Sequence, residues 1–225
     1  MSEGPMRIDV WSDIACPWCY IGKRRFEEGA RRFAESTGRP VEVEYHAFEL
    51  APDTPVDFEG SEVDFLVHHK GMSEERVRSM LDQMTETARG EGLEYDFAGL
   101  RHTKTFRAHE LLHHAKAKGL QEPMKERLLR AYFTEGRHLG HVDQLADLAA
   151  EVGLDRDEVV AVLEEGRYSD AVLDDMAVAQ RLGIRGVPFY VIDQRYGVSG
   201  AQPAELFEEA LNRAAALSAQ EDAAP

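Results

Sequence analysis

The stretch DVWSDIACPWCYIGKRRFEEGARRF, residues 9–33, decides the fold of this chain. It contains the only two cysteines among 225 residues, Cys16 and Cys19. Residues 7–11, just before them, alternate apolar and polar side chains as a strand does. Residues 20–36, just after them, repeat apolar side chains at helical spacing. The sequence therefore predicts a C-x-x-C motif between the end of a strand and the first turn of a helix.

Working outward, the remaining segments predict an α/β protein interrupted by a long helical block. Apolar stripes at helical spacing, separated by short breaks with glycine, fill the middle of the chain without a comparable strand pattern. The predicted order is strand, helix, strand, helical block, strand, strand, helix, at residues 7–11, 20–36, 41–50, 61–182, 188–192, 196–201 and 203–217. We therefore expect one domain formed by two parts of the chain, residues 6–60 and 183–217. Residues 61–182 would form a helical insertion domain, and residues 218–225 a frayed polar tail.

The charge composition of the chain excludes some classes of binding partner. Lys and Arg total 26 against 42 Asp and Glu, which gives a formal net charge of -16. Such a charge repels nucleic acid and anionic membrane surfaces. No stretch approaches the length of an apolar membrane span, and the first residues lack the basic and apolar pattern of a secretion signal. We expect a cytoplasmic protein without a nucleic-acid or membrane partner, and nothing in the sequence specifies its oligomeric state.

In a cytoplasmic protein the cysteine pair is not expected to be a structural disulfide, because such disulfides are rare in that compartment. A C-x-x-C motif there is more typical of redox or metal chemistry. At a helix N-terminus, unpaired N–H groups and the helix dipole favour the thiolate. We therefore predict that Cys16 is the nucleophile and that Cys19, one turn later, resolves the mixed disulfide. Pro17 suits the first helical position and fixes the backbone between the sulfurs.

Three other interpretations of the pair are weaker. Structural zinc needs about four ligands, and no second pair at zinc-finger spacing exists, so we expect no metal. A disulfide closing so short a loop would add little stability. Two inert core cysteines remain an alternative, although the strand, C-x-x-C and helix context argues against it.

Several segments of the sequence together resemble a known protein family. The segments CPWC (residues 16–19), AYFTEGRHL (131–139), GVPFYVI (186–192) and GVSGAQP (197–203) are similar to the DsbA-like branch of thioredoxin-fold oxidoreductases, and specifically to its FrnE-type cytoplasmic members. The likeness runs from residue 7 to about 215. It implies a thioredoxin fold with a helical insertion. It also implies a protein disulfide oxidoreductase or isomerase without a cofactor, acting on thiol- or disulfide-containing proteins, with glutathione as a candidate redox partner.

The resemblance also implies roles for single residues. A cis Val187–Pro188 peptide would lie beside the cysteines, and the backbone before it would pair with a substrate segment as an added strand. Trp18 stands where a histidine often sits in DsbA, so we expect a less acidic Cys16 and a less oxidising couple. Trp18 is either an apolar face for substrates or a lid that shields the site from solvent. Asp13 either caps the turn into the helix or shuttles protons.

A rival function shares the predicted fold. Glutathione-dependent isomerases and kappa-class transferases resemble the same plan but act on small molecules, and they typically carry Ser where Cys16 stands. Retention of both cysteines favours dithiol exchange with proteins. A binding or chaperone-like module with an apolar groove near Trp11, Trp18 and Tyr20 is a third hypothesis, and it is compatible with redox activity.

The segment HELLH, residues 109–113, matches the zinc-protease signature H-E-x-x-H. Lys116 occupies the glycine position of the longer metzincin motif, and no third ligand lies at a diagnostic spacing. We interpret the segment as the surface of an amphipathic helix. The other histidines of the helical block, including His102 and His114, are expected on solvated helix faces or at helix ends.

Overall fold

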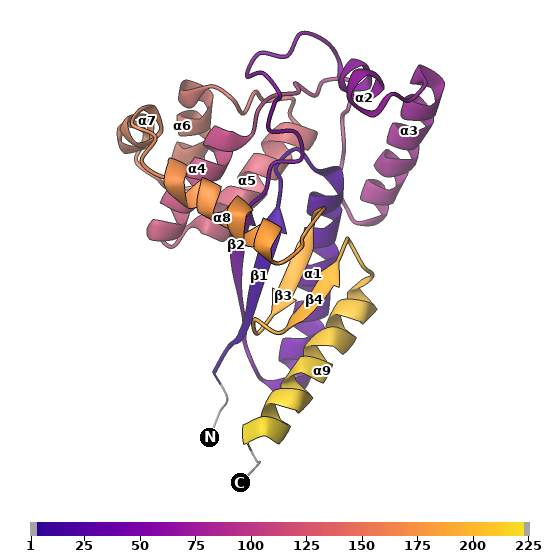
Figure 1. The fold of residues 1–225 in the computed structure, drawn as a ribbon, viewed down its shortest axis with the longest axis vertical. Helices are drawn as coiled ribbons and strands as arrows, with labels where there is room; N and C mark the ends of the chain where they lie inside the picture. The colour runs from indigo at the N-terminus through magenta and orange to yellow at the C-terminus, as the bar shows by residue number, and fades with distance from the viewer. Residues whose placement is uncertain (1–3, 223–225) are drawn as a thin grey trace.

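The computed structural model describes residues 4–222, and its centre is a four-stranded mixed sheet (Figure 1). The strand order is β2-β1-β3-β4. β1 pairs in parallel with β2 and antiparallel with β3, and β3 pairs antiparallel with β4. The strands are β1 Met6–Ser12, β2 Val41–Ala47, β3 Phe189–Ile192 and β4 Tyr196–Ser199. The predicted α/β class and the predicted order of elements are confirmed.

Helices α2 to α8 all lie between β2 and β3 in the chain, where the sequence predicted a helical block. The helices are α1 Pro17–Thr37, α2 Glu62–Lys70, α3 Glu74–Gly90, α4 Phe106–Ala117, α5 Gln121–Phe133, α6 Val142–Glu151, α7 Arg156–Glu164, α8 Ser169–Arg181 and α9 Ala204–Asp222. In Figure 1, α4 to α7 gather beyond one end of the sheet, and α2 and α3 stand apart from them on the other side. The division of the chain into domains at residues 60 and 183 stays a prediction.

The sheet buries apolar side chains on both faces, because successive strand residues point in opposite directions. Ile8 and Val10 of β1 belong to a core cluster with Phe26 of α1 and Phe207 of α9. Trp11 belongs to a second cluster, which includes Ala179 of α8. The sheet is therefore covered by α1 and α9 on one face and by α8 on the other.

A larger core fills the helical block, and it includes side chains from the segment around the cysteines. Ile14, Tyr20 and Ile21 pack in this helical core, whereas Phe26, further along α1, packs against the sheet. The C-x-x-C segment thus lies at the junction between the helical block and the sheet. This position places it within reach of residues from distant parts of the chain.

The first helix starts at Pro17, as the sequence predicted, but several other element ends differ from the prediction. β4 ends at Ser199 rather than at residue 201. β2 ends at Ala47 rather than at residue 50, because the chain turns there and the Leu50 N–H donates to the Asp13 carboxylate. The predicted frayed tail is wrong from residue 218 to 222, since α9 continues to Asp222, and residues 223–225 lie outside the described part. Within residues 4–222, none of the helices has the length and apolarity needed to span a membrane.

Candidate active site

The two cysteines are free thiols at the start of α1. Cys16 is the N-cap residue with extended backbone angles (φ -93°, ψ 110°), and Pro17 is the first helical residue. The Cys19 N–H donates to the Cys16 carbonyl at 3.0 Å, so the first helical turn carries the second sulfur back toward the first. Both side chains are buried, with 4% and 3% of their residue surface exposed.

The loop before β3 lies directly against Cys16. Cys16 Sγ lies 3.5 Å from the Val187 carbonyl oxygen, which is one of two acceptors for its single S–H proton, the other being Cys19. The Val187–Pro188 peptide is cis, as the resemblance implied. Gly22 of α1 permits this approach, because a Cβ at that position would lie 2.9 Å from Pro188 Cγ. The structure therefore brings Cys16 together with Val187 and Pro188, all three predicted for the site, although the two segments lie about 170 positions apart in the chain.

The pKa values of the two thiols are shifted in opposite directions, which the sequence did not predict. The pKa of the Cys16 thiol is raised, because it shares a hydrogen bond with Cys19, is buried and faces the Asp13 carboxylate. Burial alone would also raise the pKa of Cys19, but the hydrogen bond from Cys16 and the charge of Lys125 outweigh it and lower that pKa. The Cys16 thiolate stays a prediction, which burial, Cys19 and the Asp13 charge oppose in the free dithiol. The Cys19 N–H at the helix start does favour a Cys16 thiolate, but it is outweighed.

Asp13 is a fully buried carboxylate that binds three segments together. Its Oδ1 accepts from the Ala15 N–H (3.3 Å), the Thr105 hydroxyl (2.8 Å) and His109 Nε2 (3.3 Å), and its Oδ2 accepts from the Leu50 N–H (2.8 Å). Burial would raise the pKa of Asp13, but these donors hold it below its usual value. Asp13 thus closes the turn before α1 and remains a negative charge behind Cys16. A role as proton shuttle stays a prediction.

The interpretation of HELLH as helix surface is wrong. His109 and Glu110 are 1% and 2% exposed, and His114 is 2% exposed. The two histidines of the motif do not converge, since His109 binds Asp13 and His113 Nε2 lies 2.9 Å from the Asp175 carboxylate on α8. The physical reason is that α4 is packed against α5, α6, α7 and α8, so most of its sides are covered. His102, also predicted on a solvated face, is buried as well.

An apolar pocket of about 270 Å³ opens beside Cys16. Its walls come from the C-x-x-C loop, the segment after β2, helices α2 and α3, and Val187, and they include Phe65 and Met84. Cys16 lines this pocket together with Asp13, whereas Cys19 is buried and is not part of the pocket wall. Trp18 lines the same pocket and is 41% exposed, so it lies at the rim rather than over a closed site.

Three buried groups around Asp13 were not predicted as site residues: His109, Glu49 and Lys125. Glu49 lies just after β2, and burial and the Asp13 charge raise its pKa to about 7. Lys125 of α5 is 1% exposed. Each lies between 33 and 109 positions from Cys16, and no local motif links them to it. Their proximity follows from packing alone.

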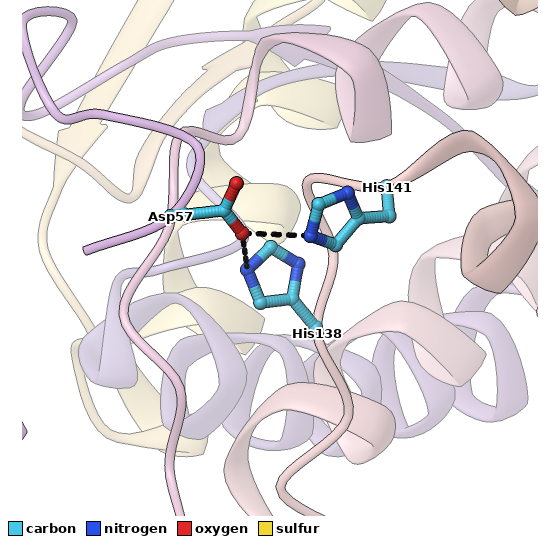
Figure 2. A group of neighbouring side chains, drawn as sticks. All are labelled: Asp57, His138 and His141. Atoms are coloured by element: carbon cyan, nitrogen blue, oxygen red, sulfur yellow. Dashed lines mark hydrogen bonds and ion pairs between the residues drawn. The ribbon is translucent and has the colours of Figure 1, made fainter. Parts of the chain in front are cut away.

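One cluster outside this region has the residue types of a metal site (Figure 2). The Asp57 carboxylate lies 2.7 Å from His141 Nε2 and 3.6 Å from His138 Nε2. However, His138 Nδ1 accepts the Gly140 N–H at 3.1 Å, so the neutral ring carries its proton on Nε2. A metal-binding histidine needs the reverse arrangement, with the second ring nitrogen donating. The cluster therefore fits a hydrogen-bonded ion pair better than a metal centre.

A second cluster of this kind surrounds His46 on β2. His46 Nδ1 lies 2.8 Å from Asp175 and Nε2 lies 2.9 Å from Asp9. Burial would lower the pKa of His46, but its bonds to the two carboxylates raise it to about 9. Both ring nitrogens are then protonated at neutral pH, so neither offers a lone pair to a metal.

Comparison with known proteins gives a match along nearly the whole chain. Residues 7–212 match the family model described as the DSBA-like thioredoxin domain. A probable DsbA oxidoreductase from Streptomyces coelicolor is 43% identical, with a TM-score of 0.87 over 93% of this chain and 89% of that one.

Two further solved structures share the fold at low identity. One is a 2-hydroxychromene-2-carboxylate isomerase, with 17% identity and a TM-score of 0.68 over 96% of this chain and 98% of that one. The other is the cytosolic disulfide reductase DsbM from Pseudomonas aeruginosa with GSH, with 19% identity and a TM-score of 0.61 over 96% and 99%. At these identities, the likeness concerns the fold alone.

Proposed function

This chain belongs to the DSBA-like thioredoxin domain family of oxidoreductases, and we propose that it exchanges disulfides with protein substrates through Cys16 and Cys19. The observation that carries the proposal is the pair of free thiols at the start of α1, with Cys16 on the pocket and Cys19 behind it. A dithiol in which one sulfur is reachable and the other is held one helical turn away suits attack followed by resolution.

The proposed reaction begins at Cys16, because access and not acidity selects the attacking sulfur. The shared hydrogen bond lets the Cys16 proton pass to Cys19, which leaves a Cys16 thiolate facing the pocket. That thiolate attacks one sulfur of a substrate disulfide, and the other substrate sulfur leaves as a thiolate and takes a proton from solvent. Cys19 then loses its proton and attacks the mixed disulfide, so two electrons pass from the dithiol to the substrate.

The surroundings of Cys16 support a polypeptide as the substrate. The Val187 carbonyl beside the sulfur is a backbone acceptor that an extended substrate segment would meet, as in strand addition to a sheet edge. Trp18 and Leu50, which are 41% and 44% exposed, add an apolar rim to the pocket. Exposed apolar side chains grouped around a reactive sulfur are typical of a binding surface.

The pocket also favours a second candidate, a glutathione-dependent activity on small molecules. Its volume of about 270 Å³ is near the lower end of small-molecule sites, and Cys16 lies on its wall. Lys70 and His69 also line it and offer groups that a peptide carboxylate would meet. The solved isomerase with this fold and the DsbM structure with GSH lend the candidate further support.

The test compares two single variants in a cell lysate. Cys19→Ser keeps the attacking sulfur but removes the resolving one, so protein adducts on Cys16 should accumulate at least severalfold over those of Cys16→Ser. Non-reducing gels measure the adducts, and insulin reduction by the unmutated protein measures turnover. Equal trapping by both variants would contradict the assigned roles.

A different result would select the second candidate. If neither variant trapped protein, insulin reduction were absent and Cys19→Ser carried only glutathione, the small-molecule activity would replace protein exchange. The cytoplasmic location and the FrnE-type branch stay predictions, and cell fractionation tests the first of them.

A further inference from the structure

Lys125 is a buried cation without a hydrogen-bond partner in the described part of the chain. Its residue surface is 1% exposed, and its Nζ has no donor or acceptor contact among residues 4–222. The ammonium lies over the Tyr45 ring on β2, whose centroid is 5.5 Å away. A buried, unpaired ammonium is costly, so its presence calls for a functional reason.

The groups that face Lys125 come from three elements. From α1 and the turn before it, the ammonium is attracted by Cys19, Asp13 and Cys16 and repelled by Lys23. From β2 it meets the Tyr45 ring, and from α4 it faces His109, whose pKa its charge lowers. The charge interaction with Cys19 is mutual, because the Lys125 ammonium in turn lowers the pKa of that thiol.

A second buried lysine provides a direct contrast. Lys23 of α1 is 5% exposed, but its ammonium forms ion pairs with Glu27 and with Glu126, the latter at 3.0 Å. Glu126 is the next residue after Lys125, but its carboxylate binds side chains of α1 and accepts hydrogen bonds from Tyr20 and Arg24. The fold thus pairs the Lys23 ammonium directly with carboxylates, whereas the Lys125 ammonium has no direct hydrogen-bond partner within residues 4–222 and is attracted at longer range by Cys19 and Asp13.

We propose that Lys125 is a positioning residue whose ammonium holds the resolving sulfur of Cys19 as a thiolate during disulfide exchange. The proposal rests on the proposed function and assigns the second half of its reaction to a residue of the helical insertion. Ser12, whose hydroxyl faces Cys19, acts in the same direction.

In the mixed disulfide, Cys16 is bonded to the substrate sulfur and Cys19 is the only free thiol of the pair. Cys19 gives its proton to solvent and remains a thiolate beside Lys125. It attacks Cys16 Sγ, the Cys16–Cys19 bond forms, the bond to the substrate breaks, and the substrate leaves as a thiolate that solvent protonates. Lys125 gains and loses no atom in this step and contributes only its charge.

The first experiment measures the Cys19 thiolate directly. In a Cys16→Ser background, only Cys19 titrates as a thiol, and the ultraviolet absorbance of its thiolate is followed against pH. Lys125→Met has a similar length without the charge and should reduce the ratio of Cys19 thiolate to thiol near neutral pH about tenfold. Lys125→Arg should restore most of it, because the charge is retained.

Lys23→Met is the matched control. It removes a buried but paired ammonium from the same region, so it should lower the melting temperature and leave the Cys19 titration unchanged. Lys125→Met should raise the melting temperature of the oxidised protein, because an unpaired buried charge disappears. A residue with only a structural role would show the reverse, a loss of stability with an unchanged titration.

The two half-reactions give the decisive kinetic readout in the otherwise unmutated protein. With a chromogenic aromatic disulfide as substrate, Lys125→Met should leave attack by Cys16 unchanged or faster and slow resolution about tenfold at neutral pH. Its equilibrium with glutathione should move about tenfold toward the oxidised protein, or about 30 mV. An unchanged Cys19 titration together with unchanged resolution would overturn the proposal. Failure of the proposed function would instead appear as absent exchange with proteins while the Cys19 titration still shifted.

Discussion

The two sides of the dithiol differ in both access and charge. On one side, Cys16 lines a pocket, lies against the Val187 carbonyl and faces the buried carboxylate of Asp13. On the other side, Cys19 is enclosed and faces the ammonium of Lys125. The reachable sulfur is therefore the less acidic one, and the more acidic sulfur is shielded.

This difference separates two properties that a single reactive cysteine would combine. A reachable thiol that keeps its proton resists unwanted alkylation and oxidation, because the thiolate is the reactive form. A shielded thiolate meets only the disulfide that forms next to it. The arrangement therefore favours the short-lived mixed disulfides of an exchange enzyme over stable adducts.

The largest expected effect concerns the redox equilibrium. A strong oxidant stabilises the thiolate of its exposed cysteine, and Cys16 lacks that stabilisation. We expect a reduction potential of roughly -250 to -150 mV, between thioredoxin and DsbA, measured in glutathione buffers by Trp fluorescence. A value near the DsbA figure of about -120 mV would mean that the Cys16 thiolate is stabilised after all and would break the comparison.

The next effect is on the reactivity of Cys16. In a Cys19→Ser background, Asp13→Asn removes the buried negative charge and should raise the rate of Cys16 alkylation near neutral pH about tenfold. Iodoacetamide kinetics against pH measure the change. Asp57→Asn, at a carboxylate whose side chain is 73% exposed, is the control and should have no effect. An unchanged Cys16 profile in Asp13→Asn would show that burial alone keeps the Cys16 proton in place.

The smallest effect concerns stability against pH on the Cys16 side. Burial raises the pKa of Glu49 to about 7, above its unfolded value, so the folded state binds more protons between pH 4.5 and 7. The free energy of unfolding should therefore fall by on the order of 2 kcal/mol as pH rises through this window. Urea unfolding of Glu49→Gln should lack this fall, whereas the exposed-site control Glu86→Gln should keep it. An identical pH dependence in Glu49→Gln and the unmutated protein would contradict the raised pKa.

Much of the fold was predictable, because its signals are local. Alternation in residues 7–11, helical spacing after Cys19 and the stripes of the central block each report on neighbours in sequence. Errors fell at element ends, where contacts with distant segments decide how far an element continues.

The HELLH segment shows why the candidate site was only partly predictable. Its pattern is consistent with an amphipathic helix, but such a pattern does not specify how many neighbours will cover the helix. Packing of α4 among four other helices buried His109 and Glu110, and it brought His109 to Asp13, 96 positions away. The same packing removed the solvent face that the prediction assumed.

By itself, the sequence determined the βα unit, the helical insertion and the C-x-x-C pair at a helix start, because these depend on periodicity and on spacing within one turn. Only the tertiary structure decided which sulfur is reachable and which one carries charge. Burial and Coulomb energy depend on the arrangement in space: Asp13 is held beside Cys16 by Thr105 and His109 of the helical block, and Lys125 comes from α5 of the same block. A short motif can therefore predict a dithiol, but the difference in pKa between its two thiols depends on charges that the surrounding fold positions.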